Sequence, residues 1–522
     1  MRVIDFFDKA VEAWPERLAF MDTELHHTYR SMQVISHRIA VALARDGNTD
    51  CARVAIYSPN RVQAFACVLG ALRAGNAWVP INARNSLEDN VEFMNLAQCE
   101  WLFYHSAFRT NAAALQRAVP TLRHLICIDQ PDGVAPAMHD WLAGTEGAMA
   151  PDVPHDPNRL TAVLGTGGTT GRSKGVMWNH LTWETLISQT TINLVEPAGA
   201  MSPVHLCVAP MTHAAGILAF MLLPVGPTNV ILDKADPLEI MQAIERHRVT
   251  HIYLPPTILY AMLAHPRVRE FNYSSLRHFI VAASPVAPDK LAEAVHVFGP
   301  CMCQLYGQAE APMVISFLSQ SEIVAATTDP LIRKRLMSCG RVNVLSRVAI
   351  MNDAGGLLPP GENGEIVLQG NLVAPGYFRD PDATAEAGRF GWHHTGDIAY
   401  RDPDGFLYIV DRKKDMIITG GFNVFSAEVE GAINGHLAVE NCAVIGVPDP
   451  KWGEAVKAVV VLKPGQSVSE EVLIEFVKQR IGSVKAPKSV EFWPELPRSP
   501  VGKIIKAKIR ERYWVGKSRA VS

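Results

Sequence analysis

The sequence predicts an α/β protein with a large N-terminal domain of helix-covered parallel sheets plus a β subdomain, followed by a small α+β C-terminal domain. Three observations predict this fold class. The chain has 522 residues, more than one compact core usually holds. Short apolar runs alternate with helical patterns over roughly the first 400 residues, as in parallel sheets covered by helices. Beyond residue 345, strand-like runs separated by Gly, Pro and Asp replace that alternation.

The expected elements follow from these patterns in chain order. Strands are expected at residues 53–58, 101–105, 124–129, 204–210, 229–232, 251–254 and 279–283, and an amphipathic helix at residues 62–74. Three further strands, at residues 347–351, 364–368 and 406–410, predict the mainly antiparallel β subdomain. The C-terminal domain is expected to contain helices near residues 427–434 and 470–479 and strands at residues 442–447 and 455–462. The polar run Asp411-Arg412-Lys413-Lys414-Asp415 places the boundary between domains at 1–412 and 413–522.

Composition excludes several classes of protein. Hydrophobic residues make up 48% and charged residues 19%, which argues against a disordered or coiled-coil chain. The net charge of −3 provides no global field for nucleic acid or an anionic membrane. We find no signal-peptide core and no apolar run long enough for stable membrane insertion. Nine cysteines without a CxxC pair predict a reduced, cytoplasmic protein, in which Cys301 and Cys303 are buried structural thiols.

A loop suited to phosphate follows the β-run at residues 161–164. It reads Gly165-Thr166-Gly167-Gly168-Thr169-Thr170-Gly171-Arg172-Ser173-Lys174-Gly175. Glycines let backbone N–H groups approach an anion, hydroxyls add donors and Lys174 adds a positive charge. The order of residues does not match a Walker A loop. The alternative, a flexible linker, rarely combines this density of Thr and basic residues directly after a strand.

The loop resembles the phosphate loop of the acyl-adenylate-forming enzymes, which include AMP-forming acyl-CoA synthetases, peptide-synthetase adenylation domains and firefly luciferase. The resemblance extends from Thr28-Tyr29 to Gly502-Lys503. Gly167 stands where the family usually has Ser, and Ser173 where it often has Pro. The resemblance implies that the loop residues which bind ATP are Thr166, Gly168, Thr169, Thr170, Gly171 and Lys174.

A second motif, Tyr306-Gly307-Gln308-Ala309-Glu310, resembles the family's YGxTE. The resemblance implies that Tyr306 packs on adenine beside Gly307, and that Glu310, together with Thr170, holds Mg²⁺ on the phosphates. Ala309 replaces the family's Thr, which removes one hydroxyl donor. Upstream, Ala282-Ala283-Ser284-Pro285 stands where the family has small residues, so Ser284 and Pro285 are expected beside the base. An ordinary strand-to-helix turn explains that segment equally well.

The segments Thr395-Gly396-Asp397 and Asp411–Asp415 resemble the family's TGD and DRxKD. By this resemblance Asp397 accepts the ribose hydroxyls and Arg412 donates to the ribose or a phosphate. Lys414 matches the hinge about which a mobile C-terminal domain rotates. A solvated charge run is the alternative for the second segment. His393 and His394 are expected to be structural.

Two late motifs resemble the family as well. Gly420-Gly421-Phe422-Asn423-Val424 resembles GGxNV, which implies that Gly420 and Gly421 line the tunnel for the pantetheine of CoA; a simple turn is the alternative. Leu496–Ile504 resembles LPRTxxGKI, which implies that Lys503 is the adenylation lysine and, with Glu310, a catalytic residue. The alternative for the basic stretch that follows is a solvated helix.

The segment Pro210–Gly216 resembles the family's sequence beside the acyl pocket. His213, Ala214 and Gly216 are therefore expected there, with a core histidine as the alternative for His213. We find no Asp at the place that adenylation domains use for an amino group, so an amino acid substrate is not expected.

Together the resemblances imply an AMP-forming acyl-CoA synthetase, an acid–thiol ligase that uses ATP, Mg²⁺ and coenzyme A. Its partner is a small carboxylic acid, expected to be fatty, aryl or alicyclic. The alternatives are an acyl-AMP ligase that loads a separate carrier protein, a luciferase-like oxygenase, and a ligand-binding protein without activity. The particular acid and a homo-oligomeric state are left open.

Overall fold

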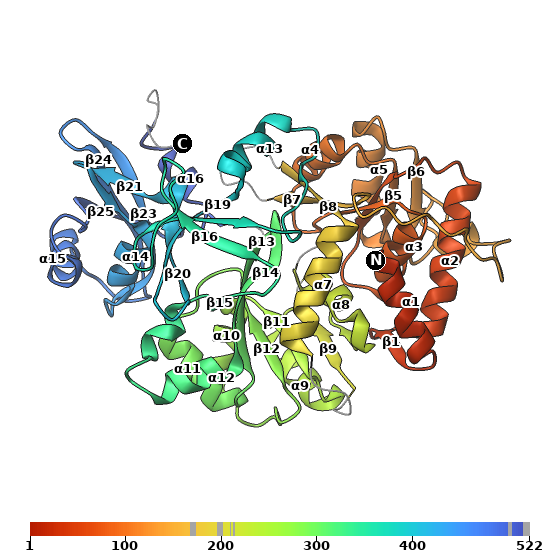
Figure 1. Cartoon of the computed structure of the whole chain (residues 1–522), viewed down its shortest axis with the longest axis horizontal. Helices are drawn as coiled ribbons and strands as arrows, with labels where there is room; N and C mark the ends of the chain where they lie inside the picture. Colours follow the sequence, from red (N-terminus) through yellow and green to blue (C-terminus); the bar gives the residue numbers. More distant parts are fainter. Residues whose placement is uncertain (167–173, 196–201, 209, 212–213, 499–503, 515–522) are drawn as a thin grey trace.

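The computed structural model describes residues 1–166, 174–195, 202–208, 210–211, 214–498 and 504–514. Within them the strands form four sheets. In Figure 1 the N-terminal part of the chain lies at the right, the C-terminal part at the left, and a small sheet containing β16 and β19 lies between them. The predicted fold class, α/β with a large N-terminal and a small C-terminal part, is confirmed.

The first sheet has seven described strands in the order β18-β8-β7-β4-β3-β5-β6. Its core is parallel and its β18 and β8 edge is antiparallel. Apart from Arg53, the central strands are apolar because both faces are covered, as is typical of parallel sheets. The bounds are β3 (Arg53–Tyr57), β4 (Ala77–Pro80), β5 (Trp101–Tyr104), β6 (His124–Cys127), β7 (Leu160–Thr166), β8 (Lys174–Asn179) and β18 (Gly376–Tyr377).

The second sheet has nine described strands in the order β15-β14-β13-β12-β11-β9-β10-β1-β2. Strands β13, β12, β11, β9, β10 and β1 are parallel to their neighbours within that run. The bounds are β1 (Leu18–Met21), β2 (His26–Thr28), β9 (Val204–Cys207), β10 (Thr228–Ile231), β11 (His251–Leu254), β12 (His278–Val281), β13 (Met302–Gln308), β14 (Ala311–Leu318) and β15 (Arg341–Val342).

Helices cover these two sheets, and several start at capping side chains that the sequence supplies. Thr28, Ser86 and Asp236 each accept a backbone N–H in the first turn of the helix that follows. The bounds are α1 (Val3–Ala13), α2 (Tyr29–Arg45), α3 (Val62–Arg73), α4 (Leu87–Ala97), η1 (Ser106–Phe108), α5 (Arg109–Ala118), α6 (Met138–Trp141), α7 (His180–Leu194), α8 (Ala214–Met221), η2 (Leu223–Val225), α9 (Pro237–His247), α10 (Pro256–Leu263), α11 (Pro288–Phe298), α12 (Gln320–Thr328) and η3 (Arg333–Met337).

The remaining two sheets belong to the last third of the chain. The third is antiparallel, in the order β16-β17-β19-β20, as predicted for the β subdomain. The fourth has the order β22-β21-β24-β23, with β25 beside β24. The bounds are β16 (Arg347–Met351), β17 (Gly364–Gln369), α13 (Pro381–Ala387), η4 (Arg389–Gly391), β19 (His393–Arg401), β20 (Leu407–Arg412), η5 (Lys413–Asp415), β21 (Ile417–Thr419), β22 (Phe422–Val424), α14 (Ser426–Asn434), β23 (Val439–Asp449), β24 (Gly453–Leu462), α15 (Glu470–Ile481), β25 (Ser489–Phe492) and α16 (Lys506–Arg510).

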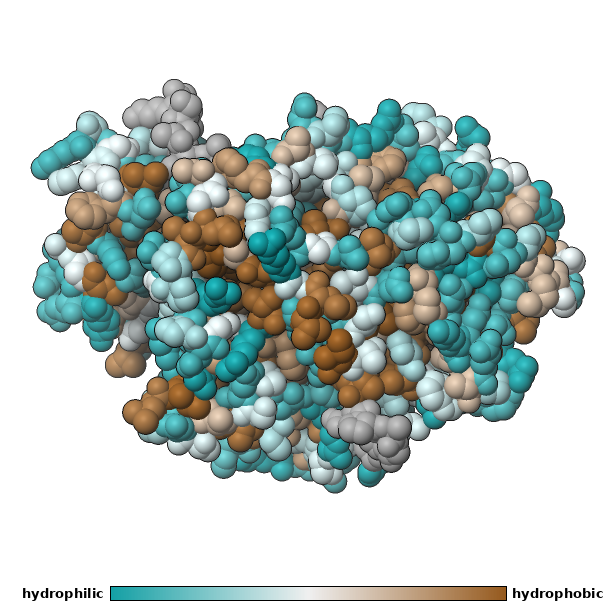
Figure 2. Space-filling model, in the orientation of Figure 1, coloured by the Kyte–Doolittle hydropathy of each residue, from teal (hydrophilic) through white to brown (hydrophobic). Residues whose placement is uncertain are grey.

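The surface in Figure 2 is mostly hydrophilic, and its hydrophobic residues gather near the middle of the face. Among the described residues, no helix combines the length and the apolar character needed to cross a bilayer. Cys301 and Cys303 are buried, in agreement with the prediction for these thiols.

Three buried histidines lie side by side across the second sheet. His205 on β9 is in register with His251 on β11, which is in register with His278 on β12. The rings of His251 and His278 stack with centroids 4.7 Å apart. Burial lowers the pKa of His205 and His251 to about 4 and that of His278 to about 3, so all three are neutral at pH 7.

This row predicts that acid destabilises the fold. Below pH 6.5 the unfolded chain binds protons that the folded row does not, so the free energy of unfolding falls between pH 6.5 and about pH 4. We expect the urea midpoint to be lower at pH 5 than at pH 7, and the difference to shrink in His205→Gln. The control is His139→Gln, at a side chain that is 68% exposed. An equal pH dependence in both variants and the wild type would contradict this account.

Candidate functional site

The predicted phosphate loop is closed at its base by a β-hairpin. Strands β7 and β8 pair antiparallel up to Gly165 opposite Gly175 and Thr166 opposite Lys174. The hydroxyl of Thr166 donates to the carbonyl of Lys174 at 3.4 Å. The loop residues Gly168, Thr169, Thr170 and Gly171 lie outside the described residues. The two ends of the loop are therefore held by paired strands of a sheet. The flexible-linker alternative gives no reason for this pairing.

Glu310 and Lys174 approach the same tyrosine, Tyr377. The Tyr377 hydroxyl donates to Oε1 of Glu310 at 2.8 Å, and Nζ of Lys174 lies 4.7 Å from the centroid of the Tyr377 ring. Strand β18 pairs with β8, which places Tyr377 opposite Val176, two residues beyond Lys174. The Tyr377 hydroxyl donates to a carboxylate, and the face of its ring contacts a cation. Tyr377 therefore links the base of the phosphate loop to Glu310.

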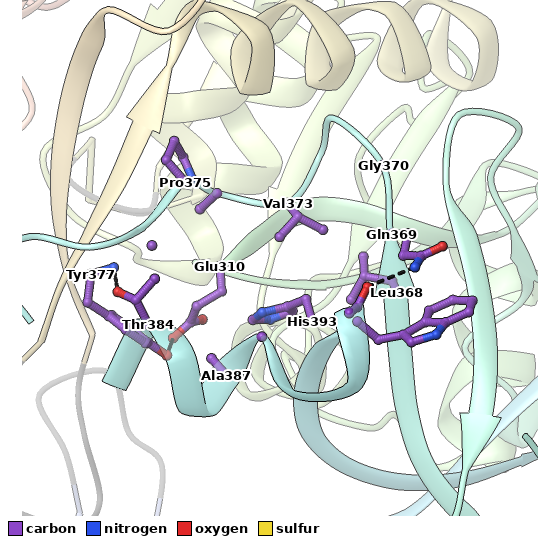
Figure 3. Close-up of a pocket in the computed structure, with 15 residues that line it drawn as sticks. Glu310, Leu368, Gln369, Gly370, Val373, Pro375, Tyr377, Thr384, Ala387 and His393 are labelled. Atoms are coloured by element: carbon purple, nitrogen blue, oxygen red, sulfur yellow. Dashed lines mark hydrogen bonds between the residues drawn. The ribbon is translucent and has the colours of Figure 1, made fainter. Parts of the chain in front are cut away.

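A cavity of about 390 Å³ opens beside Glu310. Figure 3 shows Glu310, Tyr377 and Thr384 on one side of it and His393 and Leu368 on the other. Burial lowers the pKa of His393 to about 4, so its ring is neutral, and Nε2 of His393 lies 3.2 Å from Nε2 of Gln308. Apolar side chains, among them Leu368 and Val373, therefore line this space together with neutral polar groups and one carboxylate.

Tyr306, Asp397 and Arg412 form a second polar group. The Tyr306 hydroxyl donates to Oδ2 of Asp397 at 2.6 Å, and Nε of Arg412 lies 2.6 Å from Oδ1 of the same carboxylate. Asp397 and Arg412 are paired residues of β19 and β20, whereas Tyr306 comes from β13 of another sheet. The Asp397 side chain is 3% exposed and that of Arg412 is 48% exposed, so the cation faces solvent and the carboxylate does not.

The backbone around these residues is tightly constrained. A Cβ on Gly307 would lie 2.3 Å from the backbone nitrogen of Met313, so only glycine fits there. Ala283 has a φ of 75°, an uncommon conformation for a residue with a side chain. The next two residues, Ser284 and Pro285, are exposed. Small residues thus allow the chain to turn sharply after β12.

Lys414 lies in η5, the single 3₁₀ turn between β20 and β21. Burial lowers the pKa of the Lys414 ammonium. Its neighbour Lys413 contacts Glu365 at 3.1 Å and Asp353 at 2.7 Å. Glu365 also accepts from Gly396 N at 2.9 Å and contacts Nδ1 of His394 at 2.9 Å. The run 411–415 is therefore a structured connection rather than a solvated charge run.

Gly420 and Gly421 form the turn of a hairpin between β21 and β22. Both have positive φ, 57° and 83°, which glycine adopts without strain. A Cβ on Gly420 would also lie 2.6 Å from the Trp452 ring, whereas one on Gly421 would meet no atom within 4 Å. The two glycines thus form a simple turn in this structure, and only at Gly420 does a neighbouring side chain leave no room for a Cβ.

Gly216 allows close packing within the expected acyl-pocket segment. A Cβ on Gly216 in α8 would lie 2.1 Å from the carbonyl oxygen of Met211, so the first turn of the helix needs glycine for its own packing. Ala214 is the first residue of α8. His213 lies outside the described residues, as does Lys503.

Among the described residues no group of three His, Cys, Asp or Glu side chains forms a metal cluster. Mg²⁺ in nucleotide sites is commonly held by one or two carboxylates together with substrate phosphates. Glu310, a carboxylate at the edge of the cavity beside the base of the phosphate loop, fits that donor chemistry.

Comparison with known proteins decides the family. A model described as AMP-binding enzyme matches residues 7–378, and one described as AMP-binding enzyme C-terminal domain matches residues 428–503. The chain belongs to the AMP-binding enzyme family. This membership confirms the acyl-adenylate-forming class inferred from the motifs.

Individual members of the family agree. A medium/long-chain-fatty-acid–CoA ligase of Mycobacterium tuberculosis is 38% identical over 90% of this chain and 82% of its own length. A feruloyl-CoA synthase of Amycolatopsis is 34% identical over 97% of this chain and 99% of its own. The structure of ATP-bound MatB from Rhodopseudomonas palustris superposes with a TM-score of 0.86 at 27% identity, covering 98% of this chain and 99% of that one. The predicted AMP-forming carboxylic acid–CoA ligase is confirmed as the enzyme class, and a separate carrier protein is not favoured.

Sequence reasoning missed Tyr377 and Trp178 in this AMP-binding enzyme. The indole N–H of Trp178 on β8 donates to the carbonyl of Ala309 at 2.8 Å, which ties the second motif to the strand that follows the phosphate loop. Both contacts join residues far apart in sequence. Neither the Gly376-Tyr377 pair nor a tryptophan in an apolar strand carries a sequence signal for these contacts.

Proposed function

We propose that this protein activates a fatty, aryl or alicyclic carboxylic acid with ATP and transfers the acyl group to CoA. In the first step a carboxylate oxygen attacks the α-phosphorus, the bond to the β-phosphate oxygen breaks, and acyl-AMP and pyrophosphate form. In the second step the CoA thiolate attacks the acyl carbon and AMP leaves. The observation that carries the proposal is the meeting of Glu310 and Lys174 at Tyr377 beside the cavity, within an AMP-binding enzyme.

The proposed site residues divide into three groups in the first step. Lys174 and Thr166, with Gly168, Thr169, Thr170 and Gly171, bind the phosphates. Tyr306, Gly307, Ser284 and Pro285 surround the base. Asp397 accepts the ribose hydroxyls, and Arg412, which faces solvent beside it, donates to the ribose or a phosphate. Catalysis then consists of positioning and of stabilising negative charge at the α-phosphate.

Mg²⁺ would be held by Glu310 and the Thr170 hydroxyl, and when bound it would neutralise charge on the phosphates. Tyr377 orients Glu310 through the 2.8 Å hydrogen bond. Lys503 supplies the second cation, between the substrate carboxylate and the α-phosphate.

The C-terminal domain, residues 413–522, turns about Lys414 between the two steps. This rotation removes Lys503 and brings the turn at Gly420 and Gly421 to the tunnel for CoA. The named relatives support an acid whose only charged group is the carboxylate, because fatty acids and ferulic acid carry no second charged group. His213, Ala214 and Gly216 line the acyl pocket.

Pyrophosphate release over a panel of carboxylic acids tests the substrate class. The purified protein is mixed with ATP, Mg²⁺ and CoA, and with straight-chain fatty, cinnamic-type, alicyclic, amino and dicarboxylic acids in turn. We expect release with one of the first three classes and none without acid. Release confined to amino or dicarboxylic acids would overturn the proposal, and CoA-independent light emission would favour the oxygenase alternative.

Tyr377→Phe tests the link between Glu310 and Lys174. The variant removes the hydroxyl that donates to Glu310 and keeps the ring beside Lys174. A hydrogen bond to a charged group is worth about 1.5–3 kcal/mol, so we expect a Mg²⁺ requirement raised by about tenfold at saturating ATP. Tyr400→Phe is the control, since its ring stacks on Tyr408 away from this cavity. An unchanged Mg²⁺ dependence in Tyr377→Phe would show that Tyr377 does not position Glu310.

A further inference from the structure

The short loop between β3 and α3, residues 60–62, contacts the carboxyl ends of three strands of the second sheet. Asp22 directly follows β1, Val208 follows β9, and Leu232 follows β10. Strand β10 is parallel to both β1 and β9, so the three carboxyl ends lie at one edge of the sheet. Ligands of sheets of this kind bind outside the carboxyl ends of the strands. A loop of the first sheet therefore reaches the edge of the second where a ligand is expected.

The side chain of Asn60 joins this edge to the chain that leads into α8. Its Nδ2 donates to the carbonyl of Val208 at 3.3 Å and to the carbonyl of Leu232 at 3.2 Å. Its Oδ1 accepts from the backbone nitrogen of Met211 at 2.7 Å. Asn60 is 6% exposed and Met211 is 1% exposed, so the loss of one partner leaves buried polar groups unsatisfied. Asn60 thus fixes Met211 relative to the ends of β9 and β10.

Met211 in turn contacts the first turn of α8. A Cβ on Gly216 would lie 2.1 Å from the carbonyl oxygen of Met211 and 2.3 Å from its Cα, so the two backbones touch. The backbone of Met211 is therefore held by Asn60 at its nitrogen and by Gly216 at its carbonyl. Close-packed interiors transmit such displacements, so a shift of Met211 moves the start of α8.

The loop that carries Asn60 is itself anchored. The backbone nitrogen of Val62, the first residue of α3, donates to Oδ2 of Asp22 at 3.1 Å. Helix α3 also packs against α8, since the ring centroids of Phe65 and Phe220 lie 5.8 Å apart. Asn60 is thus held at the end of a helix that shares a core with α8.

We propose that Asn60 is a positioning residue for the acid, because it sets the location of the first turn of α8. The inference rests on the proposed function, in which Gly216 lies beside the acyl pocket. Asn60 acts through Met211 and not on the reacting atoms. The base of the phosphate loop belongs to β7 and β8, and Asp397 belongs to β19. Loss of Asn60 therefore impairs the fit of the acid and leaves the fit of ATP intact.

The experiment compares Asn60→Ala and Asn60→Asp with Asn76→Ala in the full chain. Asn76 is a matched control, because it is 1% exposed and its Oδ1 accepts from Ala52 N at 3.2 Å, at the opposite end of β3. The KM for ATP and the KM for the acid that the wild type turns over fastest are measured by pyrophosphate release. We expect Asn60→Ala to raise the KM for the acid by about tenfold. Its KM for ATP should change by less than about threefold, and Asn76→Ala should change neither value.

Asn60→Asp keeps an oxygen that accepts from Met211, so its KM for the acid should rise less than that of Asn60→Ala. Equal rises in the two KM values of Asn60→Ala, or no rise in either, would overturn the proposal. A larger rise of the acid KM in Asn60→Asp than in Asn60→Ala would overturn the role of the bond to Met211.

Hydrogen exchange of the Met211 amide in the wild type gives a readout that does not depend on the folding of any variant. The exchange should be slow in the free protein, and slower with supplied acyl-AMP bound than with AMP bound. Exchange at the rate of an unprotected amide would overturn the contact with Asn60, and equal exchange in the two complexes would overturn its link to the acyl pocket. A wild type that forms no acyl-AMP with any acid would instead count against the proposed function, whereas slow exchange in the free protein would still support the contact.

Discussion

Replacing Lys503 by alanine is expected to abolish acyl-AMP formation and to leave thioester formation from supplied acyl-AMP largely intact. The ammonium group is proposed to neutralise charge where the carboxylate and the α-phosphate oxygens converge. Removing one such group costs about 10²–10³ in rate. The proposed rotation about Lys414 would remove this side chain from the pocket, so we expect the second step not to depend on it. Single-turnover assays with a labelled acid, and with chemically prepared acyl-AMP, measure the two steps separately.

Lys508→Ala is the matched control, since Lys508 is an exposed lysine five residues further along the same segment. Both half-reactions should keep wild-type rates in this control. Equal losses in the two half-reactions of Lys503→Ala would show that Lys503 does not act in one domain arrangement alone.

Replacing Lys414 by proline is expected to give the opposite pattern. Proline fixes φ at about −65° and disfavours the helical conformation of the residue before it, here Lys413 in η5. If the connection at residues 411–415 is held in one conformation, the C-terminal domain cannot turn between the steps. We expect acyl-AMP to form at a rate within about tenfold of wild type and to accumulate, because its transfer to CoA is lost.

Lys414→Ala serves as the control for this variant, since it removes the ammonium group and keeps a rotatable φ. Transfer to CoA should remain in Lys414→Ala. Overall turnover at the wild-type rate in Lys414→Pro would contradict the assignment of the hinge. The accumulated acyl-AMP can be measured by mass spectrometry after acid quenching.

Much of the fold was predictable because local patterns determine it. The apolar runs at residues 53–58 and 251–254 became β3 and β11, and the helical spacing at 62–74 became α3. Boundaries were less accurate where pairing extends a strand beyond its apolar part. Strand β23 runs from Val439 to Asp449, longer than the expected 442–447, because β24 pairs with it along its whole length.

Contiguous motifs named the candidate site residues, whereas the contacts between those residues depend on the fold. Asp397 and Arg412 lie in two separate motifs, and the structure brings them together as paired residues of neighbouring strands. The contact of Tyr377 with Glu310 depends on β18 joining the edge of the first sheet next to β8. Pairing of strands about two hundred residues apart leaves no periodic signal, so sequence patterns alone did not assign Tyr377.

For two glycines the sequence motifs did not reveal why glycine is needed. Gly216 was expected beside the acyl pocket and Gly420 along the CoA tunnel. The structure shows a neighbour that requires glycine at each position: the Met211 carbonyl for Gly216, and the Trp452 ring beside a left-handed turn for Gly420. A motif identifies the residue type that a position needs, whereas the neighbour that imposes the need appears only in three dimensions.

The central claim, that the carboxylate itself attacks the α-phosphate of ATP, is tested most directly by following the carboxylate oxygens. An accepted acid labelled with heavy oxygen in its carboxylate is turned over with ATP, Mg²⁺ and CoA, and the products are weighed by mass spectrometry. The account predicts that AMP carries one labelled oxygen, acyl-CoA keeps the other, and pyrophosphate carries none. Unlabelled AMP, or ADP with labelled phosphate, would contradict it.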